Sequence, residues 1–302
     1  MKLGLEGIIT LTTRNADDEI TGQVVVHNDI LDSGLDMLAT SVGGPFDYCR
    51  IGTGTTPVAP SQTGLQSPAA STAALAPGGN TDHAMTATSP RYNRTVFRRR
   101  FAAGTLNGTY NEIGFGPAST GNLFNRALIT PSKTVLSTET LDVEYELRTY
   151  IPTADVTGTA TIGGVSRSFT LRPVDINETS VGFGEFPWGV NRYGNALSNP
   201  GNARAYTGGA LAAQTADSPT FTAQESAPTT VTLPDAYVPG TGYRKVRFAW
   251  GLDALNVVGG SFTHMRVGVI CAKWQIEFSP AIAKDATKTM SIDLGVTFAR
   301  YP

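Results

Sequence analysis

The chain has 302 residues and a net charge of −2; 16% of its residues are charged and 40% are hydrophobic. This balance produces no strong field toward nucleic acid or an anionic membrane, so we expect neither as a partner. The 33 Gly, 18 Pro and many Thr residues mark frequent turns and favour strands. We therefore expect an all-β protein.

The first thirty residues predict a β-hairpin followed by a short helix. The stretches "LEGIITLTTR" and "ITGQVVVHN" flank the turn signal "NADDE", Asn15 to Glu19. This turn has oxygen ligands for a hard cation, but a polar hairpin tip is the favoured interpretation. The helix is expected over Asp29 to Ser41, with Asp29 as its N-cap and a helical stripe of apolar residues.

Two long segments of small residues interrupt the strand pattern. After the strand "FDYCRIGTG", residues 53–90 are rich in Pro, Ser, Thr, Ala and Gly, and residues 195–242 form a second such stretch. Residues 55–90 contain too few large apolar side chains to offset the ordering of their backbone. We therefore expect this segment to be an arm that becomes ordered against another chain.

The end of the chain reads like a copy of its middle. "KTVLSTETLDVEYELRTY" (Lys133 to Tyr150) aligns without a gap with "KDATKTMSIDLGVTFARY" (Lys284 to Tyr301). Weaker matches continue upstream in the same order. They predict two tandem β-sandwich, jelly-roll-like domains, residues 1–152 and 153–302, related by internal duplication. Alternation in the two final strands predicts that Tyr145 and Val296 point into the domain cores.

A basic strand is the first candidate site. "RYNRTVFRRRF", Arg91 to Phe101, contains the run Arg98, Arg99 and Arg100. Arginines in such a strand can bind an acidic neighbouring subunit or phosphates. They can equally be the solvated face of a strand. We expect these three arginines to lie at an interface between subunits, and contact with DNA is the least favoured alternative.

An aromatic loop is the second candidate site. It lies within "GFGEFPWGVNRYGNALSNPGN", Gly182 to Asn202, and its aromatic residues are Phe183, Phe186, Trp188 and Tyr193. Aromatic side chains in such a loop can anchor a subunit interface, pack on their own domain or stack on sugars. Interface or internal packing is favoured over glycan binding.

The sequence contains none of the common signatures of catalysis. The motifs GxSxG, GxxxxGK[ST] and HExxH are absent, and the three histidines lack the spacing of metal ligands. Asp142 and Glu144 lie on the outward face of a strand, where carboxylates are usually solvated. We therefore expect no catalytic residue, no cofactor and no metal. Cys49 and Cys271 are expected to be buried thiols rather than a disulfide.

Several of these stretches together resemble a known pattern. "IGTGTTPVAPSQTGLQ", "NEIGFG", "LFNRALI" and "K…LDVEYEL" follow one another after "HNDILDSGLDMLA". This order resembles virion proteins of tailed bacteriophages of the tail-fibre, collar and tail-appendage type, over most of residues 25–151. The resemblance implies a structural homo-oligomer in the virion, assembled in the bacterial host cytoplasm with other virion proteins. The alternatives are a receptor-binding module for host surface glycan and, third, a carbohydrate-active enzyme.

Overall fold

The computed structural model describes residues 2–40, 44–83, 89–174, 203–214, 221–254, 256, 261–269 and 272–302. These residues form two sheets and one short helix, which confirms the all-β fold class. The elements of the first half are β1 (Lys2–Arg14), β2 (Ile20–Ile30), α1 (Asp32–Ala39), β3 (Tyr48–Gly52), β4 (Pro68–Thr72), β5 (Thr81–His83), β6 (Tyr92–Phe101), β7 (Gly108–Gly116), β8 (Asn125–Val135) and β9 (Thr140–Tyr150). Those of the second half are β10 (Val156–Ile162), β11 (Val165–Val174), β12 (Ala203–Gly209), β13 (Phe221–Ser226), β14 (Thr230–Thr232), β15 (Tyr243–Trp250), β16 (Ser261–Val269), β17 (Ala272–Ala283) and β18 (Met290–Arg300).

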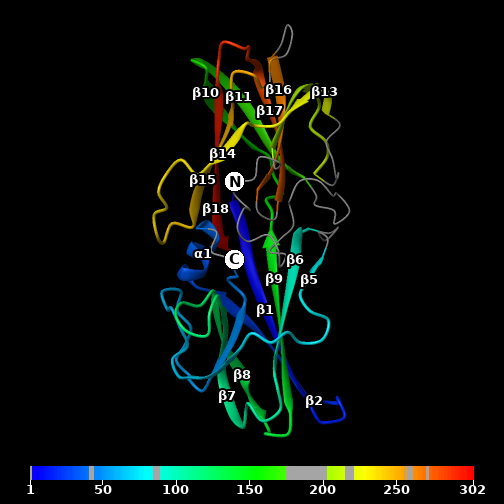
Figure 1. The fold of residues 1–302 in the computed structure, drawn as a ribbon, viewed down its shortest axis with the longest axis vertical. Coiled ribbons are helices and arrows are strands. Elements are labelled where there is room, and N and C mark those ends of the chain that lie inside the picture. The colour runs from blue at the N-terminus through cyan, green and yellow to red at the C-terminus, as the bar shows by residue number, and fades with distance from the viewer. Residues whose placement is uncertain are drawn as a thin grey trace.

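The larger sheet has twelve strands and runs through both halves of the chain. It contains β1 to β9 and continues from β1 into β18, β15 and β14. The junction is a parallel pairing of β1 with β18, from Lys2 opposite Thr297 to Leu5 opposite Arg300. Figure 1 shows an elongated molecule in which β1 and β9 run along the long axis, with β7 and β8 at one end. The six-stranded sheet, β10-β11-β17-β16-β12-β13, forms the other end.

The two halves pair their strands in the same order. Seven of the eight antiparallel pairings among β1 to β9 have a counterpart nine strands later: β1–β2 and β10–β11, β2–β8 and β11–β17, β7–β8 and β16–β17, β3–β7 and β12–β16, β3–β4 and β12–β13, β5–β6 and β14–β15, and β6–β9 and β15–β18. The eighth pairing, β1–β9, has no counterpart between β10 and β18 in the described strands. A common strand order is what a duplication predicts, and the duplication itself stays a prediction.

The register of the last two strands also matches. Arg100 on β6 lies opposite Asp142 on β9, and Arg247 on β15 lies opposite Asp293 on β18. In each case the next pair is apolar, Phe101 with Leu141 and Phe248 with Ile292. An Arg–Asp pair followed by an apolar pair therefore occurs both between β6 and β9 and between β15 and β18.

Alternation along β9 determines which side chains enter the core. Leu141, Val143, Tyr145 and Leu147 are at most 1% exposed, and Val296 on β18 is equally buried. The prediction that Tyr145 and Val296 point into the core is therefore confirmed. The Tyr145 ring packs with Phe115 at 5.1 Å between centroids and with Phe46 at 5.8 Å. These aromatic contacts form the centre of the first half's core.

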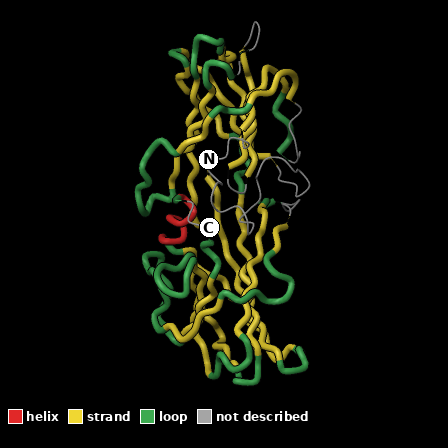
Figure 2. Tube along the Cα trace, in the orientation of Figure 1, coloured by secondary structure: helices red, strands yellow, loops and turns green. Residues whose placement is uncertain are grey.

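The helix begins later than the sequence predicts. It spans Asp32–Ala39, and its N-cap is Leu31, whose side chain makes no capping hydrogen bond. Asp29 is not the cap because it belongs to β2 and lies opposite Arg126 of β8. Figure 2 shows the helix on the flank of the molecule, near its middle. No helix in the part of the chain that the structure describes is long and apolar enough to cross a membrane.

The helix also joins the two halves. Asp36 accepts a hydrogen bond from the Gly240 backbone N–H at 2.8 Å, and its carboxylate also binds the Tyr237 hydroxyl. At the helix start, Arg300 Nη2 lies 2.6 Å from Asp32 Oδ1. The end of β18 and the loop before β15 are therefore attached to the first half.

Candidate functional site

The stretches that resemble virion proteins converge on one buried ion pair. Glu112 comes from "NEIGFG" on β7 and Arg126 from "LFNRALI" on β8, and the two strands pair directly. Arg126 Nη2 lies 2.8 Å from Glu112 Oε2, and both side chains are completely buried. A buried charge pair is tolerated only where further hydrogen bonds satisfy its remaining donors and acceptors. Here those partners come from the segment "GTGTTPVAPSQTGLQS".

Glu112 binds both ends of that segment through backbone groups. Its carboxylate accepts hydrogen bonds from the N–H groups of Gly54, Gln66 and Ser67, at 3.1, 2.9 and 2.7 Å. Burial alone raises the pKa of Glu112, but the N–H groups of Gln66 and Ser67 together with Arg126 outweigh it and hold the pKa below the ordinary value. The carboxylate is therefore the charged anchor of the loop.

Arg126 binds the middle of the same segment. Its guanidinium donates to the Thr56 carbonyl at 3.0 Å and to Gln62 Oε1 at 2.9 Å. Gln62 in turn accepts a hydrogen bond from the Ala59 N–H at 3.0 Å. Residues 53–67 are here named the clamped loop. The buried side chains of Glu112 and Arg126 hold this loop in place through hydrogen bonds.

The clamped loop corrects the expectation for residues 55–90. Its backbone is ordered by side chains of its own half, so the prediction that this part needs another chain is wrong. The same long segment also contains β4, which pairs with β3, and β5, which pairs with β6. The second segment, residues 195–242, likewise contains β12, β13 and β14. The clamped loop buries few apolar side chains, and hydrogen bonds from buried side chains to its backbone hold it in place instead.

A second buried arginine holds the neighbouring loop. Arg50 on β3 is 5% exposed, and its guanidinium donates to the carbonyls of Ala118, Thr120 and Gly121 at 2.5–2.9 Å. Glu112, Arg126 and Arg50 were all missed by sequence reasoning. The available signal was a charged residue inside a strand whose other residues are apolar, as in "NEIGFG" and "YCRIG".

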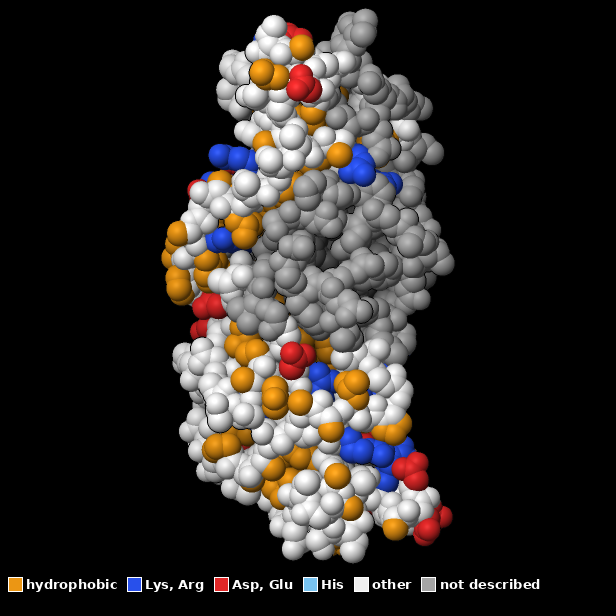
Figure 3. Space-filling model, viewed as in Figure 1, with side chains coloured by type: hydrophobic (Ala, Val, Ile, Leu, Met, Phe, Trp, Pro, Cys, Tyr) orange, Lys and Arg blue, Asp and Glu red, His pale blue; other side chains and the backbone are white. Residues whose placement is uncertain are grey.

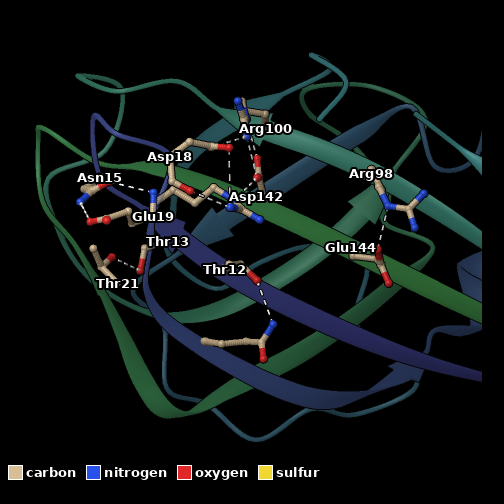
Figure 4. Close-up of polar contacts among 12 residues, drawn as sticks. Thr12, Thr13, Asn15, Asp18, Glu19, Thr21, Arg98, Arg100, Asp142 and Glu144 are labelled. Carbon is tan, nitrogen blue, oxygen red and sulfur yellow. Dashed lines mark hydrogen bonds and ion pairs between the residues drawn. The ribbon is translucent and has the colours of Figure 1, made fainter. Parts of the chain in front are cut away.

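The arginine strand β6 faces the acidic residues of β9 within one chain. Arg98 Nε lies 2.7 Å from Glu144 Oε2, and Arg100 binds Asp142 through two contacts of 2.5 and 2.7 Å. Arg14 of β1 reaches the same Asp142 at 3.2 Å. Figure 4 shows the Arg98–Glu144 and Arg100–Asp142 pairs, with Asn15, Asp18 and Glu19 of the β1–β2 turn beside Asp142. Figure 3 shows Lys and Arg side chains interspersed with Asp and Glu at this end of the molecule.

Arg99 points to the opposite side of β6 from Arg98 and Arg100. It is 3% exposed and donates to the backbone carbonyls of Phe46 and Asp47, each at 2.8 Å. Arg99 therefore supports the loop before β3 from inside the domain. The interface prediction for this strand now rests on Arg98 and Arg100 alone.

The surface between these charged pairs contains a groove lined by both polar and apolar side chains. A cavity of about 260 Å³ is lined by Thr10, Thr12, Gln23, Arg98, Asp142 and Glu144, together with five other residues. Asp142 and Glu144 both accept hydrogen bonds from arginines. Both carboxylates are therefore held in ion pairs on the sheet surface.

The turn from Asn15 to Glu19 closes on its own side chain. Asn15 Oδ1 accepts hydrogen bonds from the N–H groups of Asp17 and Glu19, at 3.0 and 2.9 Å. This is the pattern of an Asx turn, and Asp18 has a positive φ of 63°. Among the described residues, no three His, Cys, Asp or Glu side chains are grouped as they would be around a metal ion.

The other residues singled out in the sequence are the aromatic loop and the two cysteines. Of these, the structure describes only Cys49. Phe183, Phe186, Trp188 and Tyr193 lie outside the described residues, and so does Cys271. Cys49 is a buried free thiol, and burial raises its pKa. It is therefore a packing residue of β3 rather than a nucleophile.

Comparisons with protein-family models, with curated proteins and with solved structures found no match for this chain.

Proposed function

We propose that this chain is a structural, oligomeric component of a tailed-phage virion, in the neck or collar or in the tail and its appendages. The observation that supports it best is the clamp of Glu112 and Arg126. It joins three of the stretches on which the virion resemblance rests, "GTGTTP…Q", "NEIGFG" and "LFNRALI", into one rigid unit. The stretches that carry the resemblance therefore meet at one place in the fold.

A clamped loop suits a fixed contact between subunits. Ordering a mobile loop at an interface costs association free energy, and a loop that is already ordered avoids that cost. The neighbouring loop held by Arg50 is fixed in the same way. Together the two loops present a pre-shaped surface to copies of the chain or to other virion proteins.

We also propose that the two halves arose by duplication. Seven matched strand pairings and the matched Arg–Asp register support it. A tandem copy would give each chain two similar units, so a ring of such chains would present twice as many units as it has subunits. That arrangement suits contacts between virion parts of different symmetry.

The location can be tested by labelling. Antibodies raised against the purified chain are applied to tailed-phage particles released from the bacterium that carries this sequence. The proposal expects decoration at the neck, collar or tail, and detection of the chain among the proteins of purified particles by mass spectrometry. Particles that lack the chain would contradict it.

A glycan array separates this proposal from the receptor-binding alternative. The structural proposal expects no glycan to be retained by the purified chain. Specific retention that is lost in Trp188→Ala would favour the adhesin instead. Hydrolysis of a host polysaccharide would favour the enzyme.

A further inference from the structure

Strand β10 is an edge strand without the usual protection against pairing. It is the terminal strand of the six-stranded sheet and pairs only with β11 among the described strands. Its sequence, VTGTATI, contains no charged residue and no Pro. Proteins keep edges from pairing with other chains by shortness, charge or Pro. The other strands that pair with a single described neighbour follow this rule: β5 and β14 have three residues each, β4 begins with Pro68, and β13 contains Glu225.

The hairpin geometry determines which backbone groups of β10 point outward. Ile162 lies opposite Val165, and the loop between them is Gly163 and Gly164, with positive φ of 62° and 76°. Such a two-residue loop is closed by a pair that exchanges both backbone hydrogen bonds, and these pairs alternate along the strands. Ile162, Ala160, Gly158 and Val156 therefore bond toward β11. The N–H and C=O groups of Thr157, Thr159 and Thr161 point to the free edge.

We propose that β10 pairs antiparallel with β10 of a second copy of this chain, with Thr159 opposite Thr159 at the two-fold axis. The sequence reads nearly the same from both directions about Thr159. This register places Val156 opposite Ile162, Thr157 opposite Thr161 and Gly158 opposite Ala160 of the second copy. Every outward-pointing donor and acceptor of the three threonines then has a partner. Threonine pairs across strands are favourable, and no like charges meet.

The two faces of β10 fit this pairing. Thr157, Thr159 and Thr161 are exposed, whereas Gly158, Ala160 and Ile162 are half-buried. Gly158 is covered by the Phe169 ring, because a Cβ there would lie 3.0 Å from Phe169 Cζ. Gly158 lies opposite Phe169 in an unbroken register, so the glycine does not interrupt the strand. An antiparallel register about Thr159 keeps the second copy's apolar side chains on the same face as those of β10.

An apolar cavity lies on that face, between β10 and β18. It measures about 330 Å³ and is lined by Ile162, Phe169, Leu171, Phe278, Ile292 and Leu294, among others. In the first half, the equivalent strand β1 has no free edge there, because β9 pairs with it over eleven residues. The second copy's β10 takes the position beside β10 that β9 takes beside β1. The result is an isologous contact that joins two six-stranded sheets.

The inference rests on the proposed function only in that both require self-association. Its register is tested with single cysteines in the full chain under mild oxidation. Thr159→Cys is expected to give a disulfide-linked dimer, because opposed residues of a hydrogen-bonded pair lie about 5.5 Å apart at Cα. Thr161→Cys alone is the matched control. Its two copies would lie about 14 Å apart, four residues out of register, and should not link. Mixing Thr157→Cys chains with Thr161→Cys chains should restore the link.

A second variant separates pairing from folding. Thr159→Pro removes an N–H group that points to the free edge, so it should keep the thermal stability of the monomer and raise the dimer dissociation constant at least tenfold. An oligomer that keeps its mass in Thr159→Pro and gives no link through Thr159→Cys would overturn this pairing and leave the structural proposal standing. Equal linking through Thr161→Cys alone would also overturn it. A chain that stays monomeric at all concentrations would overturn both.

Discussion

Glu112 and Arg126 lie 2.8 Å apart with no solvent exposure, although fourteen residues separate them in the chain. The pair sits under a loop that begins about sixty residues before Glu112, and it supplies that loop with both a negative and a positive anchor. The loop has almost no apolar core of its own, so its conformation depends on these two side chains. The consequences can be measured.

Replacing Glu112 by Gln should destabilise the protein strongly. The change leaves the buried Arg126 charge without its counter-ion, which typically costs about 3–5 kcal/mol. The matched control is Glu144→Gln, which breaks the half-exposed pair with Arg98 and should cost no more than about 1 kcal/mol. Urea unfolding of the two variants gives both free energies. Equal costs would show that the buried pair does not hold the fold.

The same pair should make the protein sensitive to acid. The pKa of Glu112 is held below its ordinary 4.5 in the folded state, so its contribution to stability is complete above pH 4.5. It is lost as the pH falls below 4.5 through the folded-state pKa, because the unfolded chain takes up the proton first. The difference in unfolding free energy between wild type and Glu112→Gln should therefore shrink from pH 6 to pH 3. A constant difference would contradict the assignment.

His264 should give the second half its own pH dependence. Burial lowers the pKa of this histidine, and Glu277, 3.8 Å away, opposes the shift only in part. The neutral ring is therefore favoured in the folded state, and stability falls as the pH drops below 6.5, by at most about 1.4 kcal/mol per pH unit. Thermal unfolding from pH 8 to pH 5.5 should show this loss in wild type and less of it in His264→Gln. A wild type that gains stability over this range would mean that the Glu277 pair dominates.

Tyr145 should matter through its ring more than through its hydroxyl. The ring is fully buried among Phe46, Phe97 and Phe115, so Tyr145→Ala should cost about 3–5 kcal/mol. Tyr145→Phe keeps the ring and should cost less than about 1 kcal/mol, because it removes only a buried hydroxyl that makes no hydrogen bond. Urea midpoints distinguish the two variants. A Phe variant as unstable as the Ala variant would place the main contribution in the hydroxyl instead of the ring.

Local sequence patterns correctly predicted the strands and turns whose conformation depends on residues nearby in the sequence. The alternation in "LDVEYEL" was sufficient to place β9 and its buried face, and the turn signal was sufficient for the β1–β2 hairpin. The helix start was missed because β2 continues to Ile30 through its pairing with Asn125 of β8. That pairing depends on a strand almost a hundred residues away.

The site was harder to predict because its partners are distant in sequence. The basic face of β6 and the acidic face of β9 were each recognised, but their mutual register was not. In an antiparallel pair, Arg98 and Arg100 meet Glu144 and Asp142 in reverse order, as observed. The clamped loop was read as an arm for the same reason, since Glu112 and Arg126 lie outside it.

Sedimentation velocity of the purified full-length chain, over a hundredfold range of concentration, tests the central claim of self-assembly most directly. The account predicts a concentration-dependent species of at least twice the 31.8 kDa chain mass, and a shift toward monomer in Thr159→Pro. A single 31.8 kDa monomer at every concentration would contradict it.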